Sequence, residues 1–212
     1  MLPEYCCEPN RPCSPEILSE LQRVCQQFQI SIVAALIIAQ DAPCAYPPSS
    51  AYLIDPNSSP KLMCQKNKSD SLGWPESSIA KRYAACQNDC DRENPTYADG
   101  TKVGALICMD AFDAADERCR RLLKDLSVSS VGVPEAVLCV PAASETVGPE
   151  RVSRVWTHHC VIFANSYVKC DNTLGCSSFI TRNGVEIKKS EFGSVAGKED
   201  SIVTWDSDQD TG

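Results

Sequence analysis

The sequence predicts a single mixed α/β domain in which helices lie outside stacked β-sheets. Three observations support this prediction. About eight short apolar segments have the character of strands, about three or four amphipathic segments have helical periodicity, and strands alternate with helices only in the middle of the chain. Both ends carry hairpin patterns instead. A mixture of this kind indicates separate layers of helices and sheets rather than a doubly wound fold.

Composition limits the classes of protein to which the chain can belong. Its 212 residues fit one domain, 1–212, and 43% are hydrophobic, which is enough for a substantial core. The net charge of −8 argues against nucleic-acid binding, because neutralising phosphates needs a basic face. We expect the short acidic tail at 206–212 to be exposed to solvent rather than functional. The apolar run at 30–39 is too short to span a bilayer, and no secretory leader is evident, so we expect a cytoplasmic protein without membrane contact.

Cysteine is the unusual component, with 14 in the chain. A secreted disulfide scaffold is one interpretation, but several of these residues, such as Cys139 and Cys160, lie inside apolar runs as core residues would. Structural zinc is another. Cys86 and Cys90 have a possible ligand spacing, but no second pair follows at finger spacing. We therefore expect mostly reduced, buried thiols, with no metal and no cofactor.

The first half of the chain predicts one helix and three strands. Ser14 and Pro15 are a typical helix start, and the inward face of this helix is predicted from apolar residues spaced by three or four: Ile17, Leu21, Val24 and Phe28. The continuous apolar run at 30–38 indicates a strand buried on both faces. Strands at 51–54 and 62–66 form a hairpin around Asp55-Pro56.

The second half predicts a long loop followed by alternating elements. Residues 67–101 are polar and irregular, with a short helix at 79–86, and a loop of this length suggests an active-site segment. Asn183-Gly184 is the strongest hairpin signal in the chain. The remaining predicted elements are a strand at 102–108, a helix at 113–126, a strand at 136–140, a helix at 152–160, a strand at 161–168, the hairpin around Asn183-Gly184 at 177–187, and a last strand at 202–205.

The apolar run from Lys102 ends abruptly in one thiol and one carboxylate, at Cys108 and Asp110. A helix start follows at Asp113, so Cys108 is expected where a buried strand gives way to a helix. Backbone N–H groups at such a junction can stabilise a thiolate and a developing oxyanion. The competing interpretation is that Cys108 is only a small buried hydrophobic residue.

Three segments together carry a family resemblance. Glu4 lies in Leu2-Pro3-Glu4-Tyr5, Lys66 ends the returning strand after Asp55-Pro56, and Cys108 ends the run just described. This Glu, Lys, Cys order resembles the carbon–nitrogen hydrolases, also called the nitrilase superfamily. Residues 164–168 and 175–187 are similar to later segments of that family. The resemblance implies an α-β-β-α four-layer sandwich of the nitrilase type.

The resemblance also implies a chemistry. Cys108 would attack a nitrile or amide carbon, and Glu4 would act as general base. Lys66 and the N–H of Met109 would stabilise the tetrahedral intermediate, and a thioester would be hydrolysed to the acid. The implied function is a hydrolase of a small nitrile or amide that releases ammonia or an amine. The resemblance further implies a homo-oligomer.

Several of these residue assignments have alternatives. Lys61 and Lys68 compete with Lys66, because the residues before Lys66 depart from the family pattern. A second active-site glutamate is either Glu76 or Glu93. Asp110 is expected to bond the backbone or an arginine rather than take part in catalysis. Adjacent helical residues point about 100° apart, so we expect one of the two histidines 158 and 159 to be packed and the other exposed.

The chain departs from the family at its beginning. The family normally places a strand, a helix and most of a second strand before its glutamate, and Glu4 has almost nothing before it. We therefore expect an N-terminally truncated version of the fold with an exposed sheet edge. This leaves a second functional hypothesis, a catalytically inactive nitrilase-like protein that acts as a binding or oligomer subunit. A cysteine-rich metal-binding protein is the third.

Overall fold

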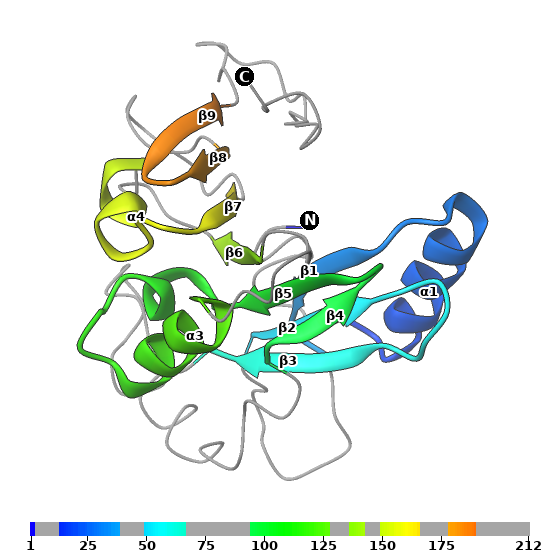
Figure 1. Ribbon diagram of the computed structural model, residues 1–212. Helices are drawn as coiled ribbons and strands as arrows, with labels where there is room; N and C mark the ends of the chain where they lie inside the picture. The colour runs from blue at the N-terminus through cyan, green and yellow to red at the C-terminus, as the bar shows by residue number, and fades with distance from the viewer. Residues whose placement is uncertain are drawn as a thin grey trace, which may run out of the picture.

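Two sheets lie between helices in the computed structural model, which describes residues 1–2, 13–38, 49–66, 94–127, 136–142, 149–165 and 178–189. The first sheet has the strand order β1-β2-β3, and the second has the order β4-β5-β6-β7-β8-β9. Helix α1 lies on one side of the sheets, and helices α3 and α4 lie on the other (Figure 1). The described residues therefore form the predicted α-β-β-α layers.

The first sheet is antiparallel and buried on both faces. It consists of β1 (Ile32–Leu36), β2 (Ser50–Ile54) and β3 (Lys61–Gln65). Successive side chains of a strand point to opposite faces. Ala34 and Tyr52 accordingly pack in the cluster beneath α1, whereas Val33 and Leu53 pack in the cluster shared with the second sheet. This explains the uninterrupted apolar run that predicted β1.

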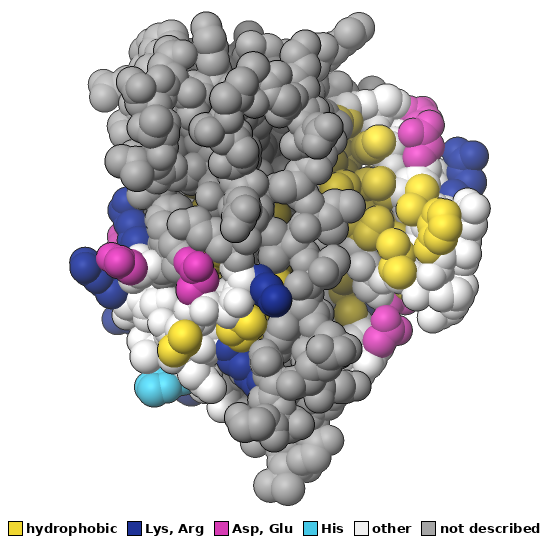
Figure 2. Space-filling view, turned by 90° about the horizontal axis from the view of Figure 1, so that it is seen from above, with side chains coloured by type: hydrophobic (Ala, Val, Ile, Leu, Met, Phe, Trp, Pro, Cys, Tyr) yellow, Lys and Arg dark blue, Asp and Glu magenta, His cyan; other side chains and the backbone are white. Residues whose placement is uncertain are grey.

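Helix α1 (Glu16–Phe28) confirms the predicted helix but not its predicted face. The Ser14 hydroxyl accepts the N–H of Glu16 at 3.4 Å, as a residue at the helix start should. Leu18, Leu21 and Cys25 pack toward the first sheet, but Val24 and Phe28 are 39% and 62% exposed. The prediction was wrong for these two because the apolar stripe of α1 is wider than the sheet covers. Hydrophobic side chains gather on the side of the molecule that carries α1 (Figure 2).

The second sheet is parallel in its centre and antiparallel at its edges. Strands β5 (Thr101–Ala105), β6 (Val137–Ala142) and β7 (Cys160–Asn165) run parallel. Parallel neighbours need crossover connections, and α3 (Glu117–Ser127) and α4 (Pro149–Val155) lie in these connections. The alternation of helices and strands in the middle of the sequence follows from this topology.

Hairpins close both ends of the second sheet. Strands β8 (Phe179–Arg182) and β9 (Val185–Lys189) flank Asn183-Gly184, whose φ angles of 51° and 76° are those of the predicted tight turn. Strand β4 (Thr96–Ala98) pairs with β5 across Asp99-Gly100. The prediction of an irregular loop over residues 67–101 was therefore wrong at the end of this range. A strand of three residues among polar neighbours leaves almost no periodic signal.

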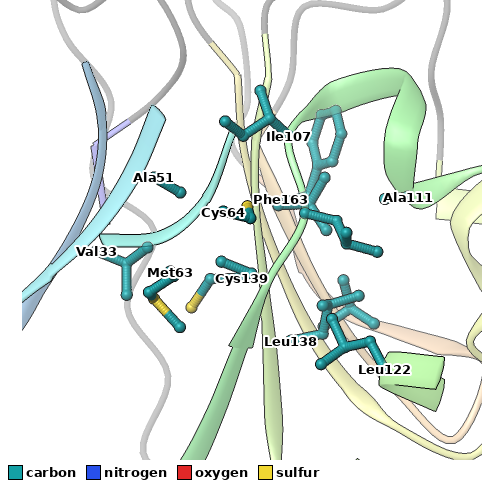
Figure 3. Close-up of a cluster of buried hydrophobic side chains, with 14 of the residues drawn as sticks. Val33, Ala51, Met63, Cys64, Ile107, Ala111, Leu122, Leu138, Cys139 and Phe163 are labelled. Atoms are coloured by element: carbon teal, nitrogen blue, oxygen red, sulfur yellow. The ribbon is translucent and has the colours of Figure 1, made fainter. Parts of the chain in front are cut away.

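The principal core lies between the two sheets and extends under α3. Val33, Ala51 and Met63 enter it from the first sheet, and Cys139 faces them from the second (Figure 3). Leu138, the preceding residue of β6, points to the opposite face of the second sheet and lies beside Leu122 of α3 (Figure 3). Gly104 allows α3 to approach β5, because a Cβ atom there would lie 3.0 Å from the Cδ1 atoms of Leu122 and Leu126. The packing of α3 on β5 matters for the site, since β5 leads directly to Cys108.

The end of α4 and the start of β7 also differ from the predictions. The helix predicted over 152–160 stops at Val155, and Cys160 instead begins β7. Between them the N–H of His159 bonds the carbonyl of Trp156 at 3.2 Å, which forms a turn. The helix predicted at 79–86 and the strand predicted at 202–205 lie outside the described residues.

In the described part of the chain, no helix has the length and apolar character needed to cross a membrane.

Candidate active site

Cys108 lies where the buried strand β5 gives way to helical turns, as the sequence predicted. Strand β5 ends at Ala105, and the N–H of Leu106 continues the pairing by bonding the carbonyl of Cys139 at 3.2 Å. Cys108 then begins the short 3-10 helix η1 (Cys108–Ala111) with φ at +49°. A residue with a Cβ in this left-handed region costs roughly 1–2 kcal/mol. The thiol is thus held on a strained turn that the surrounding structure must enforce.

Side chains from two other segments fix this turn from both sides. Before it, the Asn94 amide donates to the carbonyl of Ala105 at 2.8 Å and accepts the N–H of Ala105 at 3.0 Å. After it, the buried indole of Trp156 donates to the carbonyl of Ala111 at 2.7 Å. Such contacts fix the backbone on either side of Cys108, which favours a defined direction for its side chain.

Lys66 follows the last residue of β3. Its backbone N–H donates to the carbonyl of Ser49 at 2.8 Å, which extends the pairing of β2 with β3 by one step. The residue is only 3% exposed, whereas Lys61, at the other end of β3, is partly exposed. A lysine is almost never buried without a partner. The burial of Lys66 therefore sets it apart from the competing Lys61, and Lys68 lies outside the described residues.

Arg118 brings the segments of Lys66 and Cys108 together. It is the second residue of α3, and its Nη2 donates to the carbonyl of Gln65 at 2.9 Å. Its Nη1 lies 3.8 Å from the Oδ2 of Asp110. One guanidinium thus contacts the residue before Lys66, which ends β3 of the first sheet, and the second residue after Cys108, which lies in η1 after β5 of the second sheet. The ion pair also agrees with the expectation that Asp110 bonds an arginine.

The remaining predicted acidic residues, Glu4, Glu76 and Glu93, lie outside the described residues. Leu2 is described, and it pairs in parallel with Ala34 of β1 through a 2.8 Å bond from its N–H to the carbonyl of Val33. Leu2, the first residue of the Glu4 segment, thus lies beside a strand of the first sheet. Met109 adjoins Cys108 in η1 and is partly buried, so its predicted oxyanion role stays a prediction.

Sequence reasoning missed Asn94, Arg118 and Trp156. Asn94 sits in a polar stretch before a proline, and Arg118 is a charged residue in the first turn of a helix. Both patterns normally indicate solvated side chains. Trp156 has a largely apolar side chain, and its bond to Ala111 spans 45 positions of the sequence. None of these contacts leaves a local signal.

The thiols of the described residues divide into two groups. Cys13 is in a disulfide, and six others are buried thiols outside any disulfide: Cys25, Cys64, Cys108, Cys119, Cys139 and Cys160. Burial raises the pKa of the Cys139 thiol to about 12 and raises the pKa of Cys25 above its usual value. These two thiols are therefore neutral and unreactive near neutral pH. In the described ranges, no group of three or more His, Cys, Asp or Glu side chains is placed to hold a metal ion.

The two histidines behave as predicted, although they follow α4 rather than lie within a helix. His158 is exposed and His159 is buried, with its Nε2 at 3.1 Å from the Ser127 hydroxyl. The ring of His159 also meets the edge of Trp156 at 5.5 Å between centroids. Burial lowers the pKa of His159 below its ordinary value of 6.5, and the neighbouring His158 lowers it further.

The lowered pKa of His159 predicts a loss of stability in acid. Between the folded pKa and 6.5 the unfolded chain binds more protons than the folded chain, so the free energy of unfolding decreases as the pH falls below about 6.5. We expect His159→Gln to reduce this decrease between pH 7.5 and pH 5. Urea unfolding at both pH values measures it. His158→Gln, at an exposed position, should keep most of the native pH dependence, because burial is the larger cause of the lowered pKa of His159. An equal effect of both variants would contradict the assignment.

Comparisons with known proteins bear on the fold. No protein-family model matches the sequence, and no curated protein matches it either. Solved structures do match. A carbon–nitrogen hydrolase from Helicobacter pylori G27 superposes with a TM-score of 0.54 at 18% identity, covering 82% of this chain and 63% of the other. An amidase from Nesterenkonia sp. gives 0.52 at 15% identity, covering 81% and 61%.

A third match is part of a larger enzyme. The glutamine-dependent NAD+ synthetase from Acinetobacter baumannii superposes with a TM-score of 0.54 at 18% identity, covering 84% of this chain and 33% of that one. The chain thus spans 63% and 61% of the hydrolase and amidase that it matches. The order of the layers, the two sheets and these superpositions agree. The chain has the fold of the carbon–nitrogen hydrolases of the nitrilase superfamily, over about three fifths of their length.

Proposed function

We propose that this protein hydrolyses the carbon–nitrogen bond of a small amide or nitrile through a thioester on Cys108. The observation that carries the proposal is the strained turn at Cys108, held beside the buried Lys66 segment by Arg118. Backbone strain of this kind persists where the surroundings enforce it, and it concentrates at functional sites. A cysteine that only filled the core would not need a left-handed backbone.

For an amide, the reaction would begin with attack of the Cys108 sulfur on the carbonyl carbon. Glu4 takes the thiol proton and gives it to the nitrogen, so the C–N bond breaks and ammonia leaves. Water then attacks the thioester, Glu4 accepts one of its protons, and the C–S bond breaks. The carboxylic acid is released and the proton returns to the thiolate. No oxidant, reductant or metal ion is needed for this sequence.

Lys66 and Met109 would act on the tetrahedral intermediates. A buried ammonium next to the site stabilises the negative oxygen more than it would in water, because the surrounding dielectric is low. The N–H of Met109 lies in the first turn of η1, where the first N–H groups of a helix have no acceptor within it. The Lys66 ammonium would supply a positive charge and the Met109 N–H would supply a dipole, and both would stabilise the same oxyanion.

The solved neighbours support this choice of chemistry. One variant of the Nesterenkonia amidase shows the product of Michael addition of acrylamide at its active site cysteine, at a TM-score of 0.51 with this chain. Another variant of that amidase binds butyramide. Aliphatic amides are therefore the first substrates to test. Because the chain covers 63% of the first of these structures, its activity requires a direct measurement.

The test is ammonia release from small aliphatic amides and nitriles by the native protein and by Lys66→Gln. We expect the substitution to lower kcat by about 100- to 1,000-fold, the usual effect of removing one oxyanion-stabilising group. Lys61→Gln is the matched control, because it removes a lysine from the other end of β3, and it should retain native activity.

One outcome would contradict the proposed activity, and another would contradict the role of Lys66. A native protein that releases no ammonia from any of these compounds would favour the alternative of an inactive subunit that binds rather than hydrolyses. Equal losses in Lys66→Gln and Lys61→Gln would leave the hydrolase activity in place but remove Lys66 from the site.

A further inference from the structure

Arg118 makes contacts that a surface arginine in the first turn of a helix would not make. Its side chain is 19% exposed and lies between the end of β3 and η1. It donates a hydrogen bond to the carbonyl of Gln65, the last residue of β3 in the first sheet, and forms an ion pair with Asp110 in η1, which follows β5 of the second sheet. The guanidinium is planar, with a fixed fork of donors, so keeping both contacts sets the relative position of the two segments.

The backbone of Arg118 is itself held in place. The Asp116 carboxylate accepts the N–H of Arg118 at 2.9 Å and the N–H of Cys119 at 3.4 Å, which caps the start of α3. Leu122 and Leu126 of α3 then pack against β5 at Gly104. The arginine therefore extends from a helix whose position is fixed on the strand that leads to Cys108.

Each of its contacts lies next to a predicted site residue. Gln65 directly precedes Lys66, and Asp110 closes the η1 turn through a 3.1 Å bond from its N–H to the carbonyl of Ile107. Asp110 is 5% exposed, so its charge is poorly solvated, and losing the arginine would leave a buried carboxylate with less compensation. Movement of either contact would change the distance between the Lys66 ammonium and the Cys108 sulfur.

We propose that Arg118 is a positioning residue that fixes Lys66 relative to Cys108 across the interface of the two sheets. The inference rests on the proposed function for its chemical consequence, but its geometric part stands on the contacts alone. Arg118 acts through the two segments that it joins and does not contact the substrate. Its loss should thus affect the rate of reaction rather than substrate affinity.

The first test is a double-mutant cycle with Lys66. Arg118→Lys, which keeps the charge but loses the fork, is expected to lower kcat by about tenfold while KM changes less than about twofold. In a Lys66→Gln background the same substitution should lower kcat by less than about twofold, because the group that it positions is already absent. A purely structural role would give the same loss in both backgrounds, and that result would overturn the proposal.

The second test needs no activity. Amide hydrogen exchange should be about tenfold faster or more at Lys66 and Asp110 in Arg118→Gln, and unchanged at His159, whose N–H bond lies away from Arg118. Arg120→Gln, an exposed arginine of the same helix, is the control and should change none of the three. Native exchange at Lys66 and Asp110 in Arg118→Gln would overturn the proposal.

The two tests separate this inference from the proposed function. A native protein that hydrolyses nothing would contradict the function, and the exchange rates would then decide the role of Arg118. An active enzyme whose Arg118 variants exchange like the native protein would uphold the function and remove the positioning role.

Discussion

Replacing Cys108 by alanine is expected to lower kcat/KM for amide hydrolysis by about 10,000-fold or more, because no other atom can carry the acyl group. The residue is 1% exposed and loses a single sulfur atom in this change, so the free energy of unfolding should change by no more than about 1.5 kcal/mol. A loss of rate with little loss of stability identifies a group that reacts. Initial rates of ammonia release and urea unfolding at the same pH measure the two quantities.

Cys139→Ala is the matched control for this experiment. Cys139 is also buried, lies in the neighbouring strand β6, and has a pKa of about 12 that makes it unreactive. Its variant should keep the activity of the native protein. Acid quenching during turnover, followed by peptide mass spectrometry, should find the acyl group on the Cys108 peptide of native protein. Normal turnover by Cys108→Ala, or an acyl group on another cysteine, would contradict the assignment.

Trp156→Ala is expected to produce the largest loss of stability of any substitution discussed, about 3–5 kcal/mol. The indole is fully buried and contacts the core between the second sheet and its helices. Its removal leaves a large cavity and also leaves the Ala111 carbonyl without the indole donor. A loss of this size is a large part of the 5–15 kcal/mol that is usual for a folded domain. The measurement is urea unfolding followed by circular dichroism.

Trp156→Phe separates the hydrogen bond from the packing. Phenylalanine keeps most of the apolar volume but cannot donate to Ala111, so a loss of about 1–3 kcal/mol is expected from the unsatisfied carbonyl. His158→Ala, at an exposed position two residues further on, should change stability by less than about 0.5 kcal/mol. If Trp156→Phe were as stable as the native protein, the bond to η1 would contribute nothing to folding.

Much of the layered fold could be predicted because burial on two faces leaves a direct record in the sequence. The continuous apolar runs of β1 and β6 mark strands covered on both sides, and Asn183-Gly184 marks a turn that few other residue pairs can form. The orientation of α1 could not be predicted to the residue. Its apolar stripe includes Val24 and Phe28, and only the width of the opposing sheet decides which side chains are covered.

The candidate site was predictable only in part, for a different reason. Cys108 and Lys66 stand at the ends of apolar segments, and the end of a strand is visible in a sequence. The contacts that hold them are not. Arg118 reaches Gln65 across 53 positions, and Asn94 reaches Ala105 across 11. A polar side chain with a distant backbone partner has the same local sequence as one that faces water.

The buried thiols of the described residues are spread over every layer of the molecule. Cys25 is in α1, Cys64 in β3, Cys119 in α3, and Cys139 and Cys160 in β6 and β7. A buried thiol meets a reagent in solution only when the structure around it opens. The protein therefore carries a native set of probes, and pulsed thiol labelling in increasing urea would report the opening order of its four layers without any introduced label.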